Sequence, residues 1–402
     1  MDALFSALLL QAGYNTALVS IGAAILGASA GAIGTFVLLR KRSLVSDAVS
    51  HATLPGLALA FIAMALVTGD GRSVVGLMIG AAVSAGAGLL IVEWITQRTR
   101  LTEDAAIGAV LSVFFGFGIV LMTVIQSLDT GRQAGISGYL VGSTAGMLRS
   151  EAEIIALAAL LTGIAVYALR RPFTLVCFDQ DYAAVRGINV RATDLAMMGI
   201  LLAVTVIGLK VAGLVLIVAL TIIPPVAARF WTDRPEPMVV IAAALGALAA
   251  YLGAVISSLD DDLPTGALIV LSAFGLFVVS LVFSPRRGLL ASAVQRVAFQ
   301  AKVHQRQGLL ALARGEPIYD AYTLKILRRR GLIRADGVAT LQGRGAAAAV
   351  LHDEARWALY RQSHPHDAAG ADYHGVEPIS EIVPPDIVAD IDRRLSLREA
   401  NA

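Results

Sequence analysis

Charged residues are scarce in this chain, and cysteine is nearly absent. Asp, Glu, Lys and Arg make up 15% of the 402 residues, whereas hydrophobic residues make up 57%. Soluble domains contain about a quarter charged residues, so the composition excludes an ordinary soluble protein and indicates a membrane protein. The single cysteine, Cys177, excludes an intramolecular disulfide and a cysteine-based zinc cluster. The net charge of +2 is too small to indicate a nucleic-acid partner.

Motifs of nucleotide and peptide hydrolysis are also missing. The sequence contains neither the GxxxxGKS/T pattern of a phosphate-binding loop nor the HExxH pattern of a zinc protease. If nucleotide energises this chain, the ATPase is therefore a separate polypeptide. The N-terminus lacks a basic region and a small-residue cleavage site before its first apolar stretch, so we expect that stretch to be retained as a helix.

Long apolar runs are abundant. A helix needs about 20 apolar residues to cross the hydrocarbon core of a bilayer. Phe5–Gln11 is too short and is expected at the interface, while Leu195–Phe230 is either two short spans turning at Lys210 or one long span with a re-entrant piece. Eight or nine spans are therefore predicted. They are Ala17–Leu39, Ser50–Thr68, Ser73–Ile95, Ala105–Ile125, Ile154–Leu169, Leu195–Leu209, Val211–Phe230, Met238–Ile256 and Thr265–Phe283.

The distribution of basic residues predicts the orientation of these spans. Cytoplasmic loops are enriched in Lys and Arg. Basic residues cluster in alternate connections, and nine spans then place the N-terminus outside and the C-terminus in the cytoplasm. The clusters are Arg40, Lys41 and Arg42; Arg98 and Arg100; Arg170, Arg171, Arg186 and Arg191; Arg229 and Arg234; and Arg286 and Arg287.

The composition changes after Phe283. We predict a transmembrane domain over residues 1–285 and a second, cytoplasmic domain over residues 286–402, which contains five of the six histidines. Within it, Asp320–Gly345 has the pattern of a helix, a short turn, a strand pair and the start of another helix. The expected fold is therefore an all-α polytopic membrane protein with a small α/β, winged-helix-like C-terminal domain.

An aspartate and a histidine lie at the start of the second predicted span. Asp47 and His51 are four residues apart, so in a helix they share one face. A carboxylate oxygen and an imidazole nitrogen suit Mn²⁺, Fe²⁺ or Zn²⁺ better than Mg²⁺ or Cu⁺. Pro55 removes the usual helical partner of the His51 carbonyl, and Ser50 and Thr53 could add oxygen ligands. The alternative is that Asp47 only begins the helix and that His51 is a hydrogen-bonded interface histidine.

Several further features favour structure over function. Gly27, Gly31 and Gly34 form a stripe of small residues, which indicates close helix packing rather than a pore. Pro224 and Pro225 are expected to kink a span without binding anything. Glu103 and Asp104 have the position of acids that begin a helix.

Four motifs occur in order between roughly Ala17 and Pro285. They are RKRSLVSDAVSHATLPGLALAF (Arg40–Phe61), TEDAAIGAVLSVFFGFGIVL (Thr102–Leu121), GLKVAGLVLIVALTIIPPVAARF (Gly208–Phe230) and DLPTGALIVLSAFGLF (Asp262–Phe277). Together they resemble the membrane permeases of manganese, zinc and iron ATP-binding-cassette (ABC) importers. This resemblance implies a homodimeric permease in a bacterial plasma membrane, docked on a cytoplasmic ATPase and supplied by an extracytoplasmic metal-binding protein.

The same resemblance assigns roles to individual residues. It implies that Asp47 and His51 bind the transported metal, which is cargo, with no permanently bound cofactor. It also implies that the loop Cys177–Val190 couples to the ATPase. In that loop Ala183 and Gly187 hold small-residue positions and Asp181 lies beside them. Considered without the resemblance, this loop is an ordinary amphipathic linker helix.

The C-terminal segment contains LKILRRRGLIRADGVATLQGRGAAAAVLHDEARWALYRQ, which begins at Leu324, and then EPISEIVPPDIVADIDRRL. These stretches resemble a reduced form of the diphtheria-toxin-type, metal-dependent repressors, although EARWALY, with Glu354 and Ala358, replaces the usual metal-binding pattern. Nucleic acid is not expected as a partner, because on a tethered domain Arg328, Arg329 and Arg330 favour a solvated face or a contact with the ATPase. The candidate metal ligands of this segment are His352, His364, His366, His374, Glu377 and Glu381. For a histidine-rich tail, however, solvent-exposed side chains are the favoured interpretation.

Three functions therefore remain open from the sequence. The favoured one is a permease subunit of an ABC importer for Mn²⁺, Fe²⁺ or Zn²⁺, with Mn²⁺ or Fe²⁺ preferred. The second is a membrane-tethered, metal-responsive regulator. The third is an ion-coupled secondary metal transporter, which would need no ATPase.

Overall fold

The computed structural model describes residues 2–11, 13–68, 73–127, 148–260, 263–365, 367 and 375–400. Its residues divide into two compact units, Met1–Leu290 and Ala291–Ala402, and α12 (Leu289–Arg314) begins just before the division. The first unit contains α1 (Asp2–Leu8), α2 (Tyr14–Leu39), α3 (Ser43–Thr68), α4 (Val74–Arg98), α5 (Glu103–Ser127), α7 (Arg149–Phe178), α8 (Gln180–Val185), α9 (Val190–Trp231), α10 (Pro235–Ser257) and α11 (Thr265–Phe283).

Nine helical segments in the described part of the chain are long and apolar enough to cross a membrane. They are α2, α3, α4, α5, α7, the two halves of α9, α10 and α11. This agrees with the upper of the two predicted counts. α1 has only seven residues, so it is too short to span, as expected from Phe5–Gln11.

The helix α9 is the region in which the sequence left two alternatives. Its halves, Val190–Leu209 and Ala212–Trp231, are each long enough to span. They meet at Gly213, whose φ of 73° and ψ of 169° interrupt the helix. Gly208 packs against the side chain of Ile217, so the chain folds back here. The structure therefore favours two spans, and the break lies at Gly213 rather than at Lys210.

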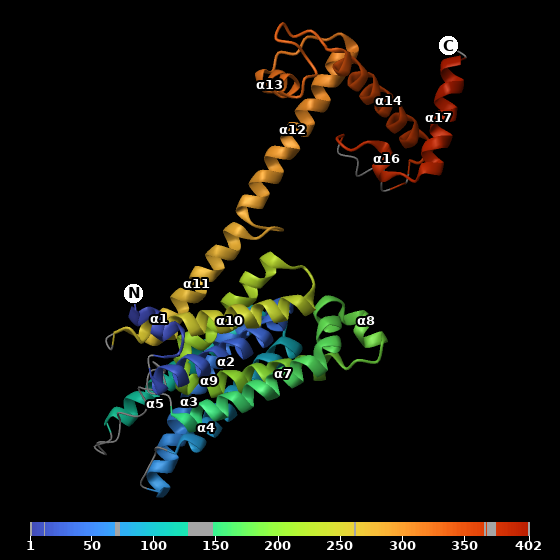
Figure 1. The fold of residues 1–402 in the computed structure, drawn as a ribbon. Helices are drawn as coiled ribbons and strands as arrows, with labels where there is room; N and C mark the ends of the chain where they lie inside the picture. The colour runs from blue at the N-terminus through green and yellow to red at the C-terminus, as the bar shows by residue number, and fades with distance from the viewer. Residues whose placement is uncertain are drawn as a thin grey trace. The chain divides into compact units, whose positions relative to one another are not determined.

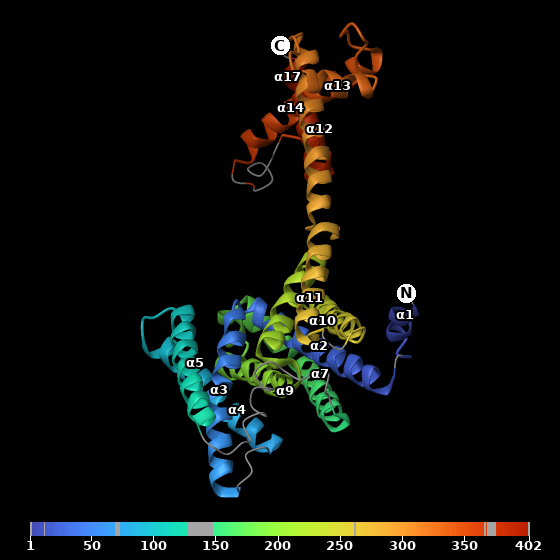
Figure 2. The same cartoon turned by 90° about the vertical axis from the view of Figure 1, so that its left-hand side faces the viewer.

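Two groups of helices meet at α9. α2 packs against α7, α9 and α10, and α11 packs on α9 and α10, whereas α3, α4 and α5 pack against one another. α9 contacts both groups and joins them (Figures 1 and 2). The largest apolar core, which includes Ile33, Phe36 and Leu201, lies along this junction.

The small-residue stripe of α2 is an interface, as predicted. A Cβ on Gly27 would lie 2.3 Å from the carbonyl oxygen of Gly246 in α10. On Gly34 it would lie 2.1 Å from the carbonyl oxygen of Thr221 in α9. The backbones of these helices therefore touch, which only glycine permits at such a distance.

The second unit continues from α12 through α13 (Ala321–Arg329), α14 (Leu341–Ser363), α16 (Ile379–Ile382) and α17 (Pro385–Ala400). It has two small apolar clusters. In the first, Leu309 of α12 packs with Leu327 of α13. In the second, Trp357 and Tyr360 of α14 pack with residues of α16 and α17.

The predicted strand pair of the second unit is wrong. Between α13 and α14 the chain forms one isolated antiparallel bridge, Ile333 with Ala339, and no strand occurs in the ranges that the structure describes. Gly331, before the bridge, and Gly337, in the turn between its two residues, both have positive φ, and only residues 332–334 and 338–340 pair through backbone hydrogen bonds, which is too short for a ladder. The described part of this unit is helical rather than α/β.

Candidate metal-binding pair and its surroundings

Asp47 and His51 lie in the second and third turns of α3, and their side chains face each other. His51 Nε2 is 3.4 Å from Asp47 Oδ1. The Asp47 side chain is 38% exposed and that of His51 is 21% exposed. Two different ligand atoms therefore converge on one side of α3, with one flank open in the isolated chain.

The imidazole of His51 is held from its side by α5. The ring of Phe115 meets it edge to face, with centroids 4.9 Å apart. Nδ1 of His51 is buried and has no hydrogen-bond partner in the described structure. An unpaired buried nitrogen costs free energy unless a ligand or water satisfies it. The site thus has unused binding capacity on its imidazole.

The nearby hydroxyls are largely committed within the protein. Ser50 Oγ donates to the Ser46 carbonyl at 2.8 Å, and Thr53 Oγ1 donates to the Ser50 carbonyl at 2.6 Å. Both residues are fully buried. Ser46 Oγ shares a 2.6 Å hydrogen bond with Thr221 Oγ1 of α9. The structure therefore does not add Ser50 and Thr53 to the open side of the pair as free oxygen ligands.

Glycines fix the position of α3 just beyond the pair. A Cβ on Gly118 of α5 would lie 2.7 Å from Cβ of Leu54 and 3.3 Å from Cδ of Pro55. On the α4 side, a Cβ on Gly56 would lie 2.1 Å from the Gly80 carbonyl oxygen. Pro55, which leaves the His51 carbonyl without its helical donor, is therefore enclosed between two closely packed helices.

The predicted coupling loop forms the short helix α8. Asp181 and Gly187 are exposed, whereas Ala183 is fully buried against this chain. Asp179 caps the helix by accepting a hydrogen bond from the Tyr182 N–H at 2.8 Å. Gly187 has a φ of 80° and open space around its Cβ position. Asp181 and Gly187 are therefore accessible to a partner, and Ala183 seats α8 on its own bundle.

The candidate ligands in the second unit do not assemble. His352 and Glu381 are exposed on separate helices, and His364 stacks on Tyr360 while sharing a hydrogen bond with Ser363. His366 and His374 lie outside the described residues. Among the residues that are described, no group of three or more His, Cys, Asp or Glu could hold a metal ion. The described residues thus do not bring His352, His364 and Glu381 together, and a metal site in this unit stays a prediction.

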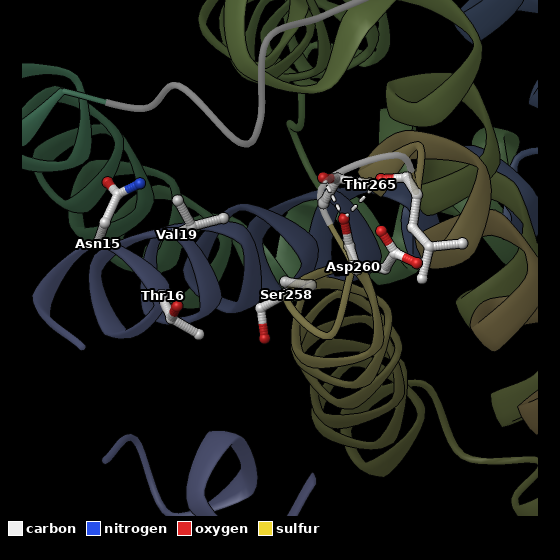
Figure 3. Close-up of a pocket in the computed structure, with 9 residues that line it drawn as sticks. Asn15, Thr16, Val19, Ser258, Asp260 and Thr265 are labelled. Atoms are coloured by element: carbon white, nitrogen blue, oxygen red, sulfur yellow. Dashed lines mark hydrogen bonds between the residues drawn. The ribbon is translucent and has the colours of Figure 1, made fainter. Parts of the chain in front are cut away.

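A polar cavity of about 190 Å³ lies elsewhere in the first unit, between the start of α2 and the end of α10 (Figure 3). Asn15, Thr16, Ser258 and Asp260 line it. The nearby hydroxyls of Ser257 and Thr265 share a 2.7 Å hydrogen bond. This cavity supplies one carboxylate, and neither Asp47 nor His51 borders it.

A network of charged residues near α8 was missed by the sequence reasoning. Arg40, directly after α2, forms two hydrogen bonds with Asp194 of α9, at 3.0 and 2.8 Å. Arg42 lies 2.7 Å from Glu103 of α5 and 3.7 Å from Asp194. The hydrogen bonds to Asp194 are the main cause that raises the pKa of Arg40 above its ordinary value. The sequence signal was the presence of acids at the starts of two spans opposite a basic loop.

Comparison with known proteins gives a consistent result. The chain is 37% identical over 310 residues to the manganese transport system membrane protein MntC of Bacillus subtilis, covering 77% of this chain and 70% of the relative. It is 34% identical over 277 residues to the zinc transport system membrane protein TroC of Treponema pallidum, covering 69% and 91%.

A solved structure supports the fold. PsaBC from Streptococcus pneumoniae, in complex with Fab, aligns with a TM-score of 0.60 at 27% identity, over 71% of this chain and 96% of that chain. Residues 14–284 match the model of the ABC 3 transport family, and this range includes all nine candidate spans. The chain therefore belongs to the ABC 3 transport family.

Proposed function

We propose that this chain is the permease subunit of an ABC importer that moves a divalent transition metal ion through the Asp47–His51 site. The chain is a transport component and not an enzyme, and ATP hydrolysis belongs to a separate chain. The single observation that carries the assignment is the family match over the nine-span unit, which contains this ionisable pair. Ionisable side chains within spans are costly and usually functional.

The ligand chemistry supports a transition metal as cargo. One carboxylate and one imidazole suit Mn²⁺, Fe²⁺ or Zn²⁺, and the 3.4 Å approach of His51 Nε2 to Asp47 Oδ1 supports a shared ion. Two side chains from one chain are few ligands, so a passing ion would be held weakly enough to be released. The two similar proteins described above are named for manganese transport and for zinc transport. We favour Mn²⁺ or Fe²⁺.

A second copy of the chain completes the proposed pathway. The Asp47 side chain is 38% exposed, and Phe115 of α5, which contacts His51, is 40% exposed. A half-exposed carboxylate facing lipid would be expensive, whereas the same carboxylate facing a subunit interface can line a cavity. The proposed importer is therefore a homodimer with the metal path between its two α3 helices.

The remaining partners follow from the ends of the bundle. We place the short helix α8 at the cytoplasmic side of a bacterial plasma membrane, where Asp181 and Gly187 contact the ATPase. Support comes from Arg186 and Arg191 in the same loop, since basic residues favour the cytoplasmic side. An extracytoplasmic metal-binding protein delivers the ion to the opposite face.

The second unit is proposed to regulate transport from the cytoplasm, and its resemblance to a metal-dependent repressor is part of this proposal. Support is limited to α12 and α13, which pack through Leu309 and Leu327 and end in a basic stretch. Uptake by the full chain and by a chain ending before Ala291 would be compared over a range of metal concentrations. Regulation predicts different concentration dependence; identical curves would remove this role.

The test of the main proposal is metal uptake into proteoliposomes that contain the permease, its ATPase and its binding protein. Because both ligands are expected to bind the ion, Asp47→Asn and His51→Ala should each lower ATP-dependent uptake at least tenfold. Asp104→Asn is the matched control, since Asp104 is exposed and lies at the start of α5, eleven residues before Phe115. Wild-type uptake in either folded site variant would exclude the site.

The same assay separates the alternative functions. Uptake that proceeds without ATP would indicate a secondary transporter. Absence of uptake for Mn²⁺, Fe²⁺ and Zn²⁺, together with specific DNA binding, would indicate a tethered regulator.

A further inference from the structure

We propose that Arg40, held by Asp194, is the positioning residue that transmits movement of α8 to α3 and so to the metal-binding pair. This inference rests on the proposed function of the chain as an ATPase-driven permease. It assigns a role to an ion pair whose members are 154 residues apart in the sequence.

Arg40 joins three helices at one end of the bundle. It directly follows α2, and its guanidinium forms a two-point contact with the Asp194 carboxylate in the second turn of α9, at 3.0 and 2.8 Å. With its amide oxygen turned towards Arg40, Gln180 at the start of α8 accepts a hydrogen bond from Nη2 at 2.7 Å. A planar guanidinium with several fixed donors is suited to such a junction.

The junction is well shielded from solvent. The side chains of Arg40 and Asp194 are 15% and 8% exposed. Ion pairs that are mostly buried are screened little by salt and keep a defined geometry better than pairs on the surface. The contact between α8, α9 and the end of α2 therefore has a defined geometry.

A rigid turn connects Arg40 to α3. The Lys41 N–H donates to the Leu38 carbonyl at 2.9 Å, and the Arg42 N–H donates to the Val37 carbonyl at 3.0 Å. Lys41 has a φ of 61°, which closes α2 with the paired hydrogen bonds typical of a helix C-terminus. α3 begins one residue after Arg42. A displacement of Arg40 would therefore also displace the first turn of α3.

Arg42 extends the same junction to the helices around the metal-binding pair. It lies 2.7 Å from Glu103 at the start of α5, the helix that also supplies Phe115 against His51. It is 3.9 Å from Glu93 of α4 and 3.7 Å from Asp194. Asp47 follows Ser43 by about one helical turn. The two helices that form the metal site, α3 and α5, therefore both begin at this charged cluster.

The test compares metal uptake with ATP hydrolysis in the reconstituted full importer. In Asp194→Asn, we expect ATP hydrolysis within twofold of wild type but uptake reduced at least tenfold, so that fewer ions move per ATP. Arg40→Lys keeps the charge but loses the two-point geometry, and we expect an intermediate ratio. The charge-exchanged pair Arg40→Asp with Asp194→Arg should regain part of the lost uptake.

A matched control is Arg149→Gln, which removes an exposed ion pair with Glu153 at 3.0 Å and should leave the ratio unchanged. The inference is overturned if the ratio is unchanged in both Asp194→Asn and Arg40→Lys. It is also overturned if uptake and hydrolysis fall in parallel with thermal stability, which would show a purely structural contact. A wild-type chain that never transports metal would instead remove the proposed function, and the two failures are thereby distinguished.

Discussion

Gly187 shows how a single residue can be tested for a partner contact that an isolated chain does not contain. Its φ of 80° lies in a region that L-residues rarely adopt, and no atom lies within 4 Å of a Cβ built there. Any substitution is therefore strained, whether or not a partner is present.

The prediction at Gly187 separates strain from obstruction. We expect Gly187→Arg to weaken ATPase association and lower uptake at least tenfold, because a large side chain would occupy the proposed docking surface. Gly187→Asn, a residue that tolerates positive φ, should retain most uptake. Association of the permease with its ATPase would be measured by co-purification. Equal association of both variants would exclude Gly187 from the docking surface.

Tyr360 provides a pH-dependent prediction for the second unit. Its hydroxyl donates to Asp367, and this hydrogen bond, followed by burial, raises the pKa of Tyr360 to about 12. Because the folded pKa is above the usual value near 10, the contribution to stability is complete below about pH 10 and is lost as the pH rises towards 12.

The measurement is thermal unfolding of the full chain carrying Trp94→Phe and Trp231→Phe between pH 8 and pH 12, so that the fluorescence of Trp357 reports on the second unit. Wild type should lose stability more steeply above pH 10 than Tyr360→Phe, which cannot ionise. Parallel pH curves for the two proteins would show that this hydrogen bond is not formed.

The sequence could predict the site residues that lie close together in the chain, but not those that meet only when helices pack. Asp47 and His51 were identified because spacing of four places two side chains on one helical face, a purely local property. Arg40 and Asp194 could not be paired in advance, because their contact depends on how α2 and α9 pack. For the histidines of the second unit the sequence favoured exposed side chains over a metal site, because their abundance carries no information about the distances between them.

At the scale of elements, hydropathy predicted the helices well because apolar length is decided within each segment. All nine candidate spans overlap the predicted ones, including the pair within α9. The position of the break in α9 was displaced to Gly213, since backbone freedom at glycine, rather than the charge of Lys210, allows the turn. The strand pair failed because two turns leave a single bridge between α13 and α14.

The α2–α10 interface gives a prediction for an element. A Cβ on Gly27 would lie 2.3 Å from the Gly246 carbonyl oxygen, so the helices would have to separate. We expect Gly27→Ala to lower the thermal midpoint of the purified permease clearly. Gly163→Ala in α7 meets no atom within 4 Å and should be neutral or slightly stabilising. The idea of a backbone contact fails if Gly27→Ala is as stable as Gly163→Ala.

At the scale of the whole molecule, the proposed homodimer can be tested by cross-linking introduced cysteines, because the chain has a single native cysteine to remove. In a Cys177→Ser background, Phe115→Cys places one thiol beside the metal-binding pair on a side chain that is 40% exposed in wild type. We expect this variant to cross-link readily between subunits in membranes. Leu160→Cys, on an exposed position of α7, is the control and should cross-link far less. Equal cross-linking at both positions would place the dimer interface elsewhere.

The glycine contacts around α3 also bear on how the importer could move. Where Gly56 meets Gly80, the two helices touch through main chain, and the small side chains of Ala60 and Ser84 flank the contact. Long side chains that interlock must change rotamer before helices can shift, whereas glycine and alanine have no rotamer to reset. At this point α3 could therefore move against α4 by a small shear while the two helices remain in contact. An alternating-access cycle would then require little repacking at this contact.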